Sequence, residues 1–186
     1  RLSVDIDLTY VPLKPRQEAL KEISESLKRI ATTLRKTIPN CKVQESINSK
    51  SKLVSKLVIS VGETIKIEPN EILRGTFHPP KSLSLVEQAK KLFELETSIN
   101  VVDTAELYGG KLCAALDRQH PRDLFDVKIL LEQEGITTKI RQAFVISLAS
   151  HDRPMSEVID PTRKDIRETF ENYFEGMTTD PVNLDD

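Results

Sequence analysis

The sequence predicts an α+β protein in which a mixed β-sheet is flanked by helices and followed by a helical C-terminal part. Extended stretches gather before residue 102, and stretches with helical periodicity follow one another after residue 103. Of the 186 residues, 38% are hydrophobic and 30% are charged, which allows a packed core and excludes wholesale disorder. We therefore predict two parts, residues 1–102 and residues 103–186.

The first part combines strands with one long helix. Residues 3–9 alternate between apolar and polar side chains, as a half-buried strand does. Apolar residues three or four positions apart predict an amphipathic helix over residues 16–38, which ends before Pro39. The other elements predicted here are strands at 42–47, 52–61, 64–68 and 98–102, a hairpin turn at Gly62-Glu63, an irregular loop at 70–82 and a short helix at 84–95.

The second part shows helical periodicity, and helices are expected at 104–117, 121–134, 136–150 and 162–174. Two distant cysteines, no signal peptide and no apolar run near the roughly 20 residues of a membrane span indicate a cytoplasmic protein. The formal net charge of −2 gives no global attraction to nucleic acid or to a membrane, so a basic site must be local.

The first predicted strand places two aspartates on one face. Asp5 and Asp7 point away from the side that Val4, Ile6 and Leu8 share. Like charges at this spacing repel each other unless a cation lies between them. The two residues form either a solvated strand face or a D-x-D pair that binds a divalent metal ion.

A third carboxylate lies on the polar side of the strand predicted at 64–68, where Lys66 and Glu68 share one face. If this strand lies beside the first, Glu68 converges with Asp5 and Asp7. Three carboxylates on adjacent strands suit one or two Mg²⁺ ions, which neutralise the phosphates of a nucleotide. The alternative for Lys66 and Glu68 is a solvent-facing edge strand with cross-strand ion pairs.

Lys111 is unusual for its surroundings, because its helical neighbours three and four residues away are largely apolar. Its side chain either snorkels to solvent or points into a cleft. Gly109 and Gly110 in the middle of the helix each cost about 1 kcal/mol relative to alanine, and they allow close approach of backbone or ligand. The alternative is a surface lysine beside a helix kink.

The stretch RQHPRDLFD (118–126) begins a new helix at Pro121. Arg122 and Asp126 are four residues apart and can form an ion pair, while Asp123 and Asp126 lie on overlapping faces. These three side chains face away from the apolar side of the same helix. They are either functional or part of a capped helix with an intrahelical ion pair.

In this order, these stretches resemble the AbiEii-type family of abortive-infection toxins, the nucleotidyltransferase-like toxins of type IV toxin–antitoxin systems. The resemblance covers roughly residues 1–135, and its third and fourth motifs are specific in combination. The matching stretches are RLSVDIDL (1–8), IKIE (65–68), ELYGGKLCAAL (106–116) and RQHPRDLFD (118–126) for the first to the fourth motif.

The resemblance implies a nucleotidyltransferase-like fold and transfer of a nucleotide from an NTP, with Mg²⁺ or Mn²⁺, to an acceptor. In related toxins the acceptor is the tRNA 3′ end, and a toxin implies a cognate antitoxin. The implied roles are metal binding by Asp5, Asp7 and Glu68, phosphate binding by Lys66, Lys111 and Arg122, base or second-site acid chemistry by Asp126, and support by Asp123. Glu68 could instead orient Lys66, Arg122 could instead hold Asp126, and Lys111 is the family's essential lysine.

The family carries a Gly-Gly or Gly-Ser turn shortly before its first motif, whereas nothing precedes Arg1 here. Such a turn supplies backbone N–H groups and a hydroxyl to a triphosphate. Because the chain starts without Met and a strand follows at once, we expect an upstream segment. A molecule without that turn is expected to be poorly active.

Two other function classes remain open from the sequence. A non-catalytic module of the same fold would bind nucleotide or a partner protein without transfer. A metal-dependent nuclease also uses acidic residues and a lysine near strand ends. Its common order is acid, any residue, lysine, whereas here Lys66 precedes Glu68, which counts against this class.

Overall fold

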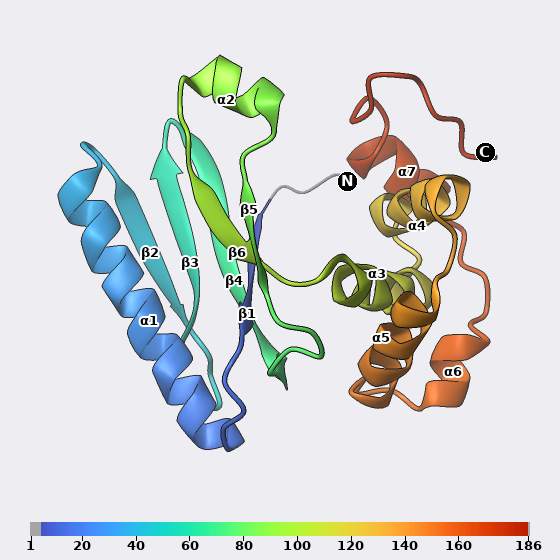
Figure 1. The fold of residues 1–186 in the computed structure, drawn as a ribbon, viewed down its shortest axis with the longest axis horizontal. Helices are drawn as coiled ribbons and strands as arrows, with labels where there is room; N and C mark the ends of the chain where they lie inside the picture. Colours follow the sequence, from blue (N-terminus) through green and yellow to red (C-terminus); the bar gives the residue numbers. More distant parts are fainter. Residues whose placement is uncertain (1–4, 186) are drawn as a thin grey trace. The chain divides into compact units, whose positions relative to one another are not determined.

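The structure is a computed structural model that describes residues 5–185, and it forms two compact units that divide between Gly75 and Thr76. Figure 1 shows the elements of both units along the chain. The start of the strand predicted at residues 3–9, including Val4, lies outside the described residues. The division precedes the expected boundary at residue 102 because the strands after residue 80 form a sheet of their own. Each unit is described by itself below.

The first unit, residues 5–75, is a four-stranded mixed sheet with one long helix. Its strands are ordered β1-β4-β3-β2, and β1 pairs with β4 in parallel while the other pairs are antiparallel. This confirms the mixed sheet that the sequence predicts. The elements are β1 (Ile6–Tyr10), α1 (Arg16–Thr37), β2 (Lys42–Ile47), β3 (Val54–Val61) and β4 (Glu63–Arg74).

Strand β4 is longer than predicted, because it continues beyond Pro69 and Asn70, where the sequence indicated a stop. The register with β1 shifts there, from Leu8 opposite Pro69 to Tyr10 opposite Arg74. The Asn70 side-chain oxygen accepts two backbone N–H groups of β4 itself, at 2.8 and 3.0 Å. This bulge absorbs the proline, which has no N–H to donate, and lets the strand resume.

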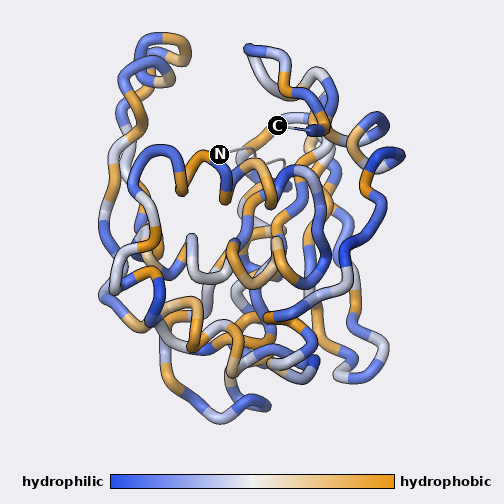
Figure 2. Tube along the Cα trace, turned by 90° about the vertical axis from the view of Figure 1, so that its right-hand side faces the viewer, coloured by the Kyte–Doolittle hydropathy of each residue, from blue (hydrophilic) through white to orange (hydrophobic). Residues whose placement is uncertain are grey.

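The core of this unit lies between α1 and one face of the sheet. Ile23 and Leu27 of α1 pack with Leu57, Ile59 and Ile67 of the central strands. Figure 2 colours the chain by the hydropathy of each residue. Because successive strand side chains point to opposite faces, the even-numbered residues from 56 to 60 in β3 and from 64 to 68 in β4 lie on the face away from α1.

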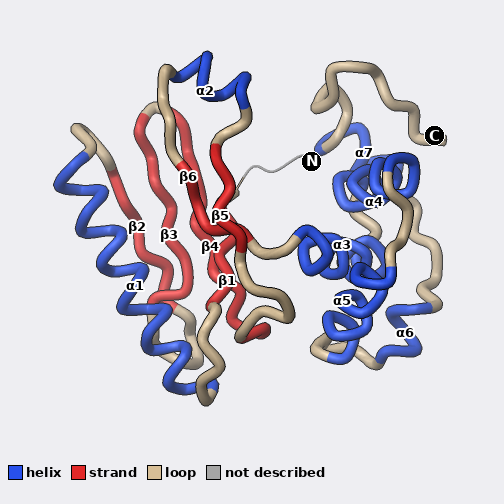
Figure 3. Tube along the Cα trace, in the orientation of Figure 1, coloured by secondary structure: helices blue, strands red, loops and turns tan. Residues whose placement is uncertain are grey.

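The second unit, residues 76–185, contains a two-stranded antiparallel sheet and helices, as Figure 3 shows by secondary structure. Its elements are β5 (Lys81–Ser84), α2 (Glu87–Phe93), β6 (Ser98–Val101), α3 (Thr104–Arg118), α4 (Pro121–Gln133), α5 (Thr138–Ala149), α6 (Met155–Ile159) and α7 (Arg167–Tyr173). None of the helices in the described part of the chain is long and apolar enough to span a membrane.

Three of the predictions for this region are wrong in detail. The loop expected at 70–82 contains the end of β4 and the start of β5, which pairs with β6. The short helix α6 was not predicted, although Val158 anchors it by complete burial. The last helix begins at Arg167 rather than near residue 162, and Phe170 within it and Phe174 just after it are buried.

Helices α3 and α5 approach each other closely at Gly109. A Cβ at this position would lie 2.6 Å from the backbone carbon of Ala143 and 2.7 Å from its Cβ, closer than such atoms come in real structures. The neighbouring Gly110 has open space where its Cβ would be. The close approach expected from the glycine pair is therefore confirmed at Gly109 alone.

We expect Gly109→Ala to destabilise the second unit by about 1–3 kcal/mol, because the added methyl group forces α3 and α5 apart. The matched control Gly110→Ala is expected to be neutral or to stabilise by up to about 1 kcal/mol, since alanine favours the helix. Urea unfolding followed by circular dichroism measures both. Equal stabilities for the two variants would contradict the close packing.

Candidate functional site

The predicted site residues of the sheet lie on the face away from α1. Asp7 of β1 is the register partner of Glu68 of β4, which confirms that the two strands are neighbours. Lys66 lies two positions before Glu68 on the same face, and Asp5 lies just before β1. The structure therefore brings all four of these side chains to one edge of one sheet.

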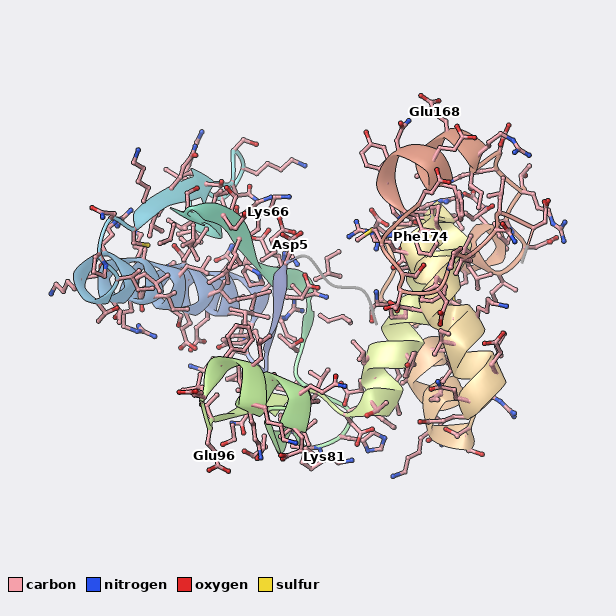
Figure 4. The ribbon with its side chains drawn as sticks, turned by 90° about the horizontal axis from the view of Figure 1, so that it is seen from above. Asp5, Lys66, Lys81, Glu96, Glu168 and Phe174 are labelled. Atoms are coloured by element: carbon pink, nitrogen blue, oxygen red, sulfur yellow. The ribbon has the colours of Figure 1, made fainter. Side chains whose placement is uncertain are left out.

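Two lysines pair with the carboxylates of this group. The Lys66 ammonium lies 3.9 Å from a carboxylate oxygen of Asp5, and Figure 4 labels both residues. The Lys56 ammonium of β3 forms an ion pair with Glu68. The side chains of both pairs remain partly exposed, so water weakens these attractions.

The chemistry of this donor set fits a hard divalent cation. Asp5, Asp7 and Glu68 offer carboxylate oxygens, which Mg²⁺ prefers. Lysine ammonium groups already act as counter-ions to two of them, which shows that positive charge is stabilised at these positions. Within residues 5–185 no three acidic, histidine or cysteine side chains are arranged closely enough to hold a metal as they stand. Binding would require the carboxylates to draw together.

The predicted site residues of the second unit meet across the tight connection between α3 and α4. Gln119 takes a left-handed conformation with φ 52° and ends α3. His120 then caps α4 by accepting the Arg122 N–H at 3.2 Å on Nδ1, and Pro121 begins the helix. This connection turns the last two turns of α3 toward the first two turns of α4.

A buried charge cluster forms at that turn. The Lys111 ammonium lies 2.7 Å from Asp126 and 3.3 Å from Asp123. Arg118, seven residues after Lys111 and on the same side of α3, donates two hydrogen bonds to Asp123 at 2.6 and 3.0 Å. The Asp123 and Asp126 side chains are only 2% and 3% exposed. Such buried carboxylates require partners of opposite charge.

The two aspartates differ in how fully they are satisfied. Burial by itself raises the pKa of Asp123, but the hydrogen bond and charge of Arg118, together with Lys111, outweigh it and hold the pKa below its ordinary value. In contrast, Oδ2 of Asp126 has the ion pair with Lys111 but no well-directed hydrogen bond from any described residue. Asp126 thus keeps an acceptor position for another proton donor.

The structure does not bring every predicted residue into a cluster. Arg122 was expected to be able to pair with Asp126, but in the described structure Lys111 occupies that carboxylate and no ion pair of Arg122 is found. Arg118, at the end of α3, takes the role of the arginine partner, and its contact is to Asp123. The i,i+4 spacing suggested the wrong partner because it considers one helix, whereas the pairing crosses a turn between two helices.

Two charged residues in these groups were missed from the sequence. The hairpin gave a signal for Lys56 that was wrong by one residue: the predicted turn at Gly62-Glu63 places Leu57 opposite Glu68, whereas the observed turn centred on Gly62 places Lys56 there. Arg118 offered a weaker signal, since its contact depends on the left-handed turn at Gln119, a residue type that rarely takes this conformation.

The depressed pKa of Asp123 predicts a pH-dependent contribution to stability. An unfolded aspartate titrates near about 3.9, and the folded value is lower, so the contribution is complete above that pH and is lost as the pH falls through the folded value. We expect Asp123→Asn to cost about 2 kcal/mol at pH 7, and the cost should shrink as the pH falls below about 3.9. Urea unfolding across this range measures it, with exposed Asp160→Asn as the control. A cost that stays constant with pH would contradict the assignment.

The chain was compared with known proteins. Comparison with curated protein sequences gave no significant match. A family described as "Nucleotidyl transferase AbiEii toxin, Type IV TA system" matches residues 1–184 of the 186. This range includes both groups of site residues, and the mixed sheet with flanking helices agrees with such a fold. The chain therefore belongs to the AbiEii nucleotidyl transferase toxin family of type IV toxin–antitoxin systems.

Proposed function

We propose that this protein is a metal-dependent nucleotidyltransferase that transfers a nucleotide from an NTP to an acceptor. The observation that carries the proposal is the parallel pairing of β1 with β4, which sets Asp7 beside Glu68 with Lys66 on the same face. The alternative, in which Lys66 and Glu68 belong to a solvent-facing edge strand, would require only that charged residues alternate along one strand. Here the carboxylates lie in the stretches that resemble the family's first and second motifs, within a family match that covers nearly the whole chain.

In this proposal the sheet residues bind the metal and the phosphates of the NTP. Asp5, Asp7 and Glu68 would hold Mg²⁺ or Mn²⁺, which when bound neutralises phosphate charge and activates an attacking hydroxyl. Lys66 would bind phosphate oxygens once it is released from Asp5. This release costs little free energy, because the contact is long and both side chains are partly exposed to water.

The proposed transfer is a displacement at the α-phosphorus. The acceptor hydroxyl oxygen forms a bond to the α-phosphorus, the bond from that phosphorus to the bridging oxygen breaks, and pyrophosphate leaves with the electron pair. The hydroxyl proton passes to a base. Asp126 fits this role because one of its buried oxygens lacks a directed hydrogen bond, which leaves it able to accept a proton.

The other residues of the second unit fit phosphate binding and support. The Lys111 side chain is 17% exposed, and its ammonium is held by two carboxylates. Arg122 makes no ion pair among the described residues, so of its two implied roles we retain phosphate binding. Asp123, which Arg118 holds with two hydrogen bonds, would support the position of Lys111.

We further propose that the acceptor is tRNA, that a cognate antitoxin is the protein's partner and that it acts in the cytoplasm. These points rest on the family. Type IV toxins require an antitoxin counterpart by definition of the system, and the family match supports that partner.

The decisive experiment incubates the full-length gene product with Mg²⁺, each α-³²P-labelled NTP in turn and total tRNA. We expect one NTP to label and lengthen tRNA, and Asp7→Asn to reduce the rate at least about a hundredfold, since a lost metal ligand removes several kcal/mol of transition-state stabilisation. Glu63→Gln, at the start of the neighbouring strand β4, is the matched control. Cleaved tRNA would indicate a nuclease, and no labelling with any NTP would contradict the proposal.

Variants of Lys111 separate catalysis from folding. Lys111→Met leaves the buried Asp126 without its counter-charge, so we expect it to destabilise the fold by about 3–5 kcal/mol as well as to abolish transfer. Lys111→Arg keeps the charge and should keep the fold, yet it should lower transfer at least about tenfold because a planar guanidinium replaces a compact ammonium. Urea unfolding and the transfer assay measure the two effects. Wild-type transfer by either variant would contradict a role for Lys111 at the phosphates.

A further inference from the structure

We propose that Lys56 is a nucleotide-binding residue that also serves as the resident counter-ion of the metal-binding carboxylates when no nucleotide is present. The inference rests on the proposed function, because it assigns a new residue to the same site. Lys56 lies in β3, outside the four stretches that resemble family motifs, and it was not predicted from the sequence.

The register of the sheet places Lys56 at this site. Leu57 pairs with Ile67 in the antiparallel β3–β4 ladder, so the preceding residue, Lys56, lies across from Glu68. On its other side, Glu68 is the register partner of Asp7 in β1. Glu68 therefore lies between a lysine on one neighbouring strand and an aspartate on the other, all on the face away from α1.

The pairing pattern indicates that lysines substitute for a metal here. Glu68 is paired with Lys56, and Asp5 with Lys66, so two of the three carboxylates hold an ammonium group. The first contact joins strands β3 and β4, and the second joins β4 to the residue just before β1. Both contacts therefore arise from the fold and not from local sequence. A cation that binds these carboxylates must compete with both lysines.

The charge of the substrate explains why a second lysine is useful. Three carboxylates outnumber Lys66 alone, and a metal–triphosphate complex is itself an anion. Without Lys56 this face would repel the complex that it has to bind. When the ion pair between Lys56 and Glu68 breaks, the flexible four-carbon side chain of Lys56 can turn its ammonium toward the phosphate oxygens instead.

The exchange is feasible because the pair is held loosely. The Lys56 and Glu68 side chains are 32% and 40% exposed, so water screens their attraction and can solvate the ammonium during the exchange. The buried pair of Lys111 with Asp126 offers no such freedom, because that carboxylate is only 3% exposed. Lys56 thus differs from Lys111 in being a partner that the carboxylate can release.

The test uses electron paramagnetic resonance to measure the affinity of the full-length protein for Mn²⁺ in the absence of nucleotide. Lys56→Gln removes the competing ammonium, so we expect it to bind Mn²⁺ about two- to fivefold more tightly than the wild type. The same variant should bind an Mn²⁺–NTP complex less tightly and raise the KM for NTP, because a phosphate contact is lost. Lys56→Arg should restore nucleotide binding in part.

Lys42→Gln is the matched control. Lys42 lies on the same face in β2, the strand at the opposite edge of the sheet, where it is the register partner of Ser60. It makes the same change of charge, so a general effect of net charge would alter Mn²⁺ binding equally in both variants. Equal effects in the two variants would overturn the proposal. So would unchanged Mn²⁺ binding in Lys56→Gln, and so would a wild type that does not bind Mn²⁺.

The outcome is distinguishable from a failure of the proposed function. If no NTP labels any acceptor but Lys56→Gln still tightens Mn²⁺ binding and weakens nucleotide binding, the assignment of Lys56 stands and the transfer reaction is wrong. If the wild type transfers nucleotide but Lys56→Gln leaves both the Mn²⁺ affinity and the KM for NTP unchanged, the assignment of Lys56 is wrong. Thermal melting of both variants shows that the exposed substitutions leave the fold intact.

Discussion

The candidate site of the first unit depends on one constraint, which is that α1 covers a single face of a four-stranded sheet. Ile23, Leu27 and Ala31 of α1 bury Leu57 and Ile67, and this fixes the direction of every other side chain on the central strands. A register slip of one residue would turn Lys66 and Glu68 into the core, where unpaired charges are very costly. The packing of the apolar face thus holds the polar face in place.

In the second unit, a comparable constraint comes from the turn between α3 and α4. Lys111 and Arg118 lie on one side of α3, and Asp123 and Asp126 lie on one side of α4. Only the left-handed residue Gln119 and the cap of His120 bring these two faces together over so short a connection. The charge cluster is therefore a property of the turn as much as of the charged residues.

The sequence was most informative where the evidence was local. Periodicity predicted α1 almost to the residue, and alternation placed Asp5, Asp7, Lys66 and Glu68 on polar strand faces that the structure places side by side. It failed where a contact depended on geometry between elements.

The extension of β4 past Pro69 depends on a bulge stabilised by Asn70, and β5 forms only because β6 is there to pair with it. The pairing of Asp123 with Arg118 instead of a neighbouring residue on α4 depends on the turn at Gln119. The predicted turn at Gly62-Glu63 places Leu57 opposite Glu68, whereas in the structure the hairpin is centred on Gly62 and Lys56 lies opposite Glu68. Three-dimensional contacts of this kind follow from register, which a pattern along one segment does not contain.

Both charge groups pair carboxylates with cations, but the carboxylates of the sheet are more exposed to water than those of the helices. At the sheet, each lysine holds one carboxylate in contact with water, so a stronger cation can replace it at little cost. In the helices, the carboxylates are buried, and removing their partner would leave an uncompensated charge.

Arg118 resolves this difficulty for Lys111. Because two hydrogen bonds from Arg118 already satisfy Asp123, the longer 3.3 Å contact from Lys111 to Asp123 can be given up without exposing that aspartate to an unpaired state. The shorter contact to Asp126 keeps the lysine in place. Lys111 can then direct a free N–H toward an anion while it still neutralises a buried carboxylate, since an ammonium has three donors. A cluster of two acids and two bases thus leaves one cation available, which an isolated Lys–Asp pair would not do.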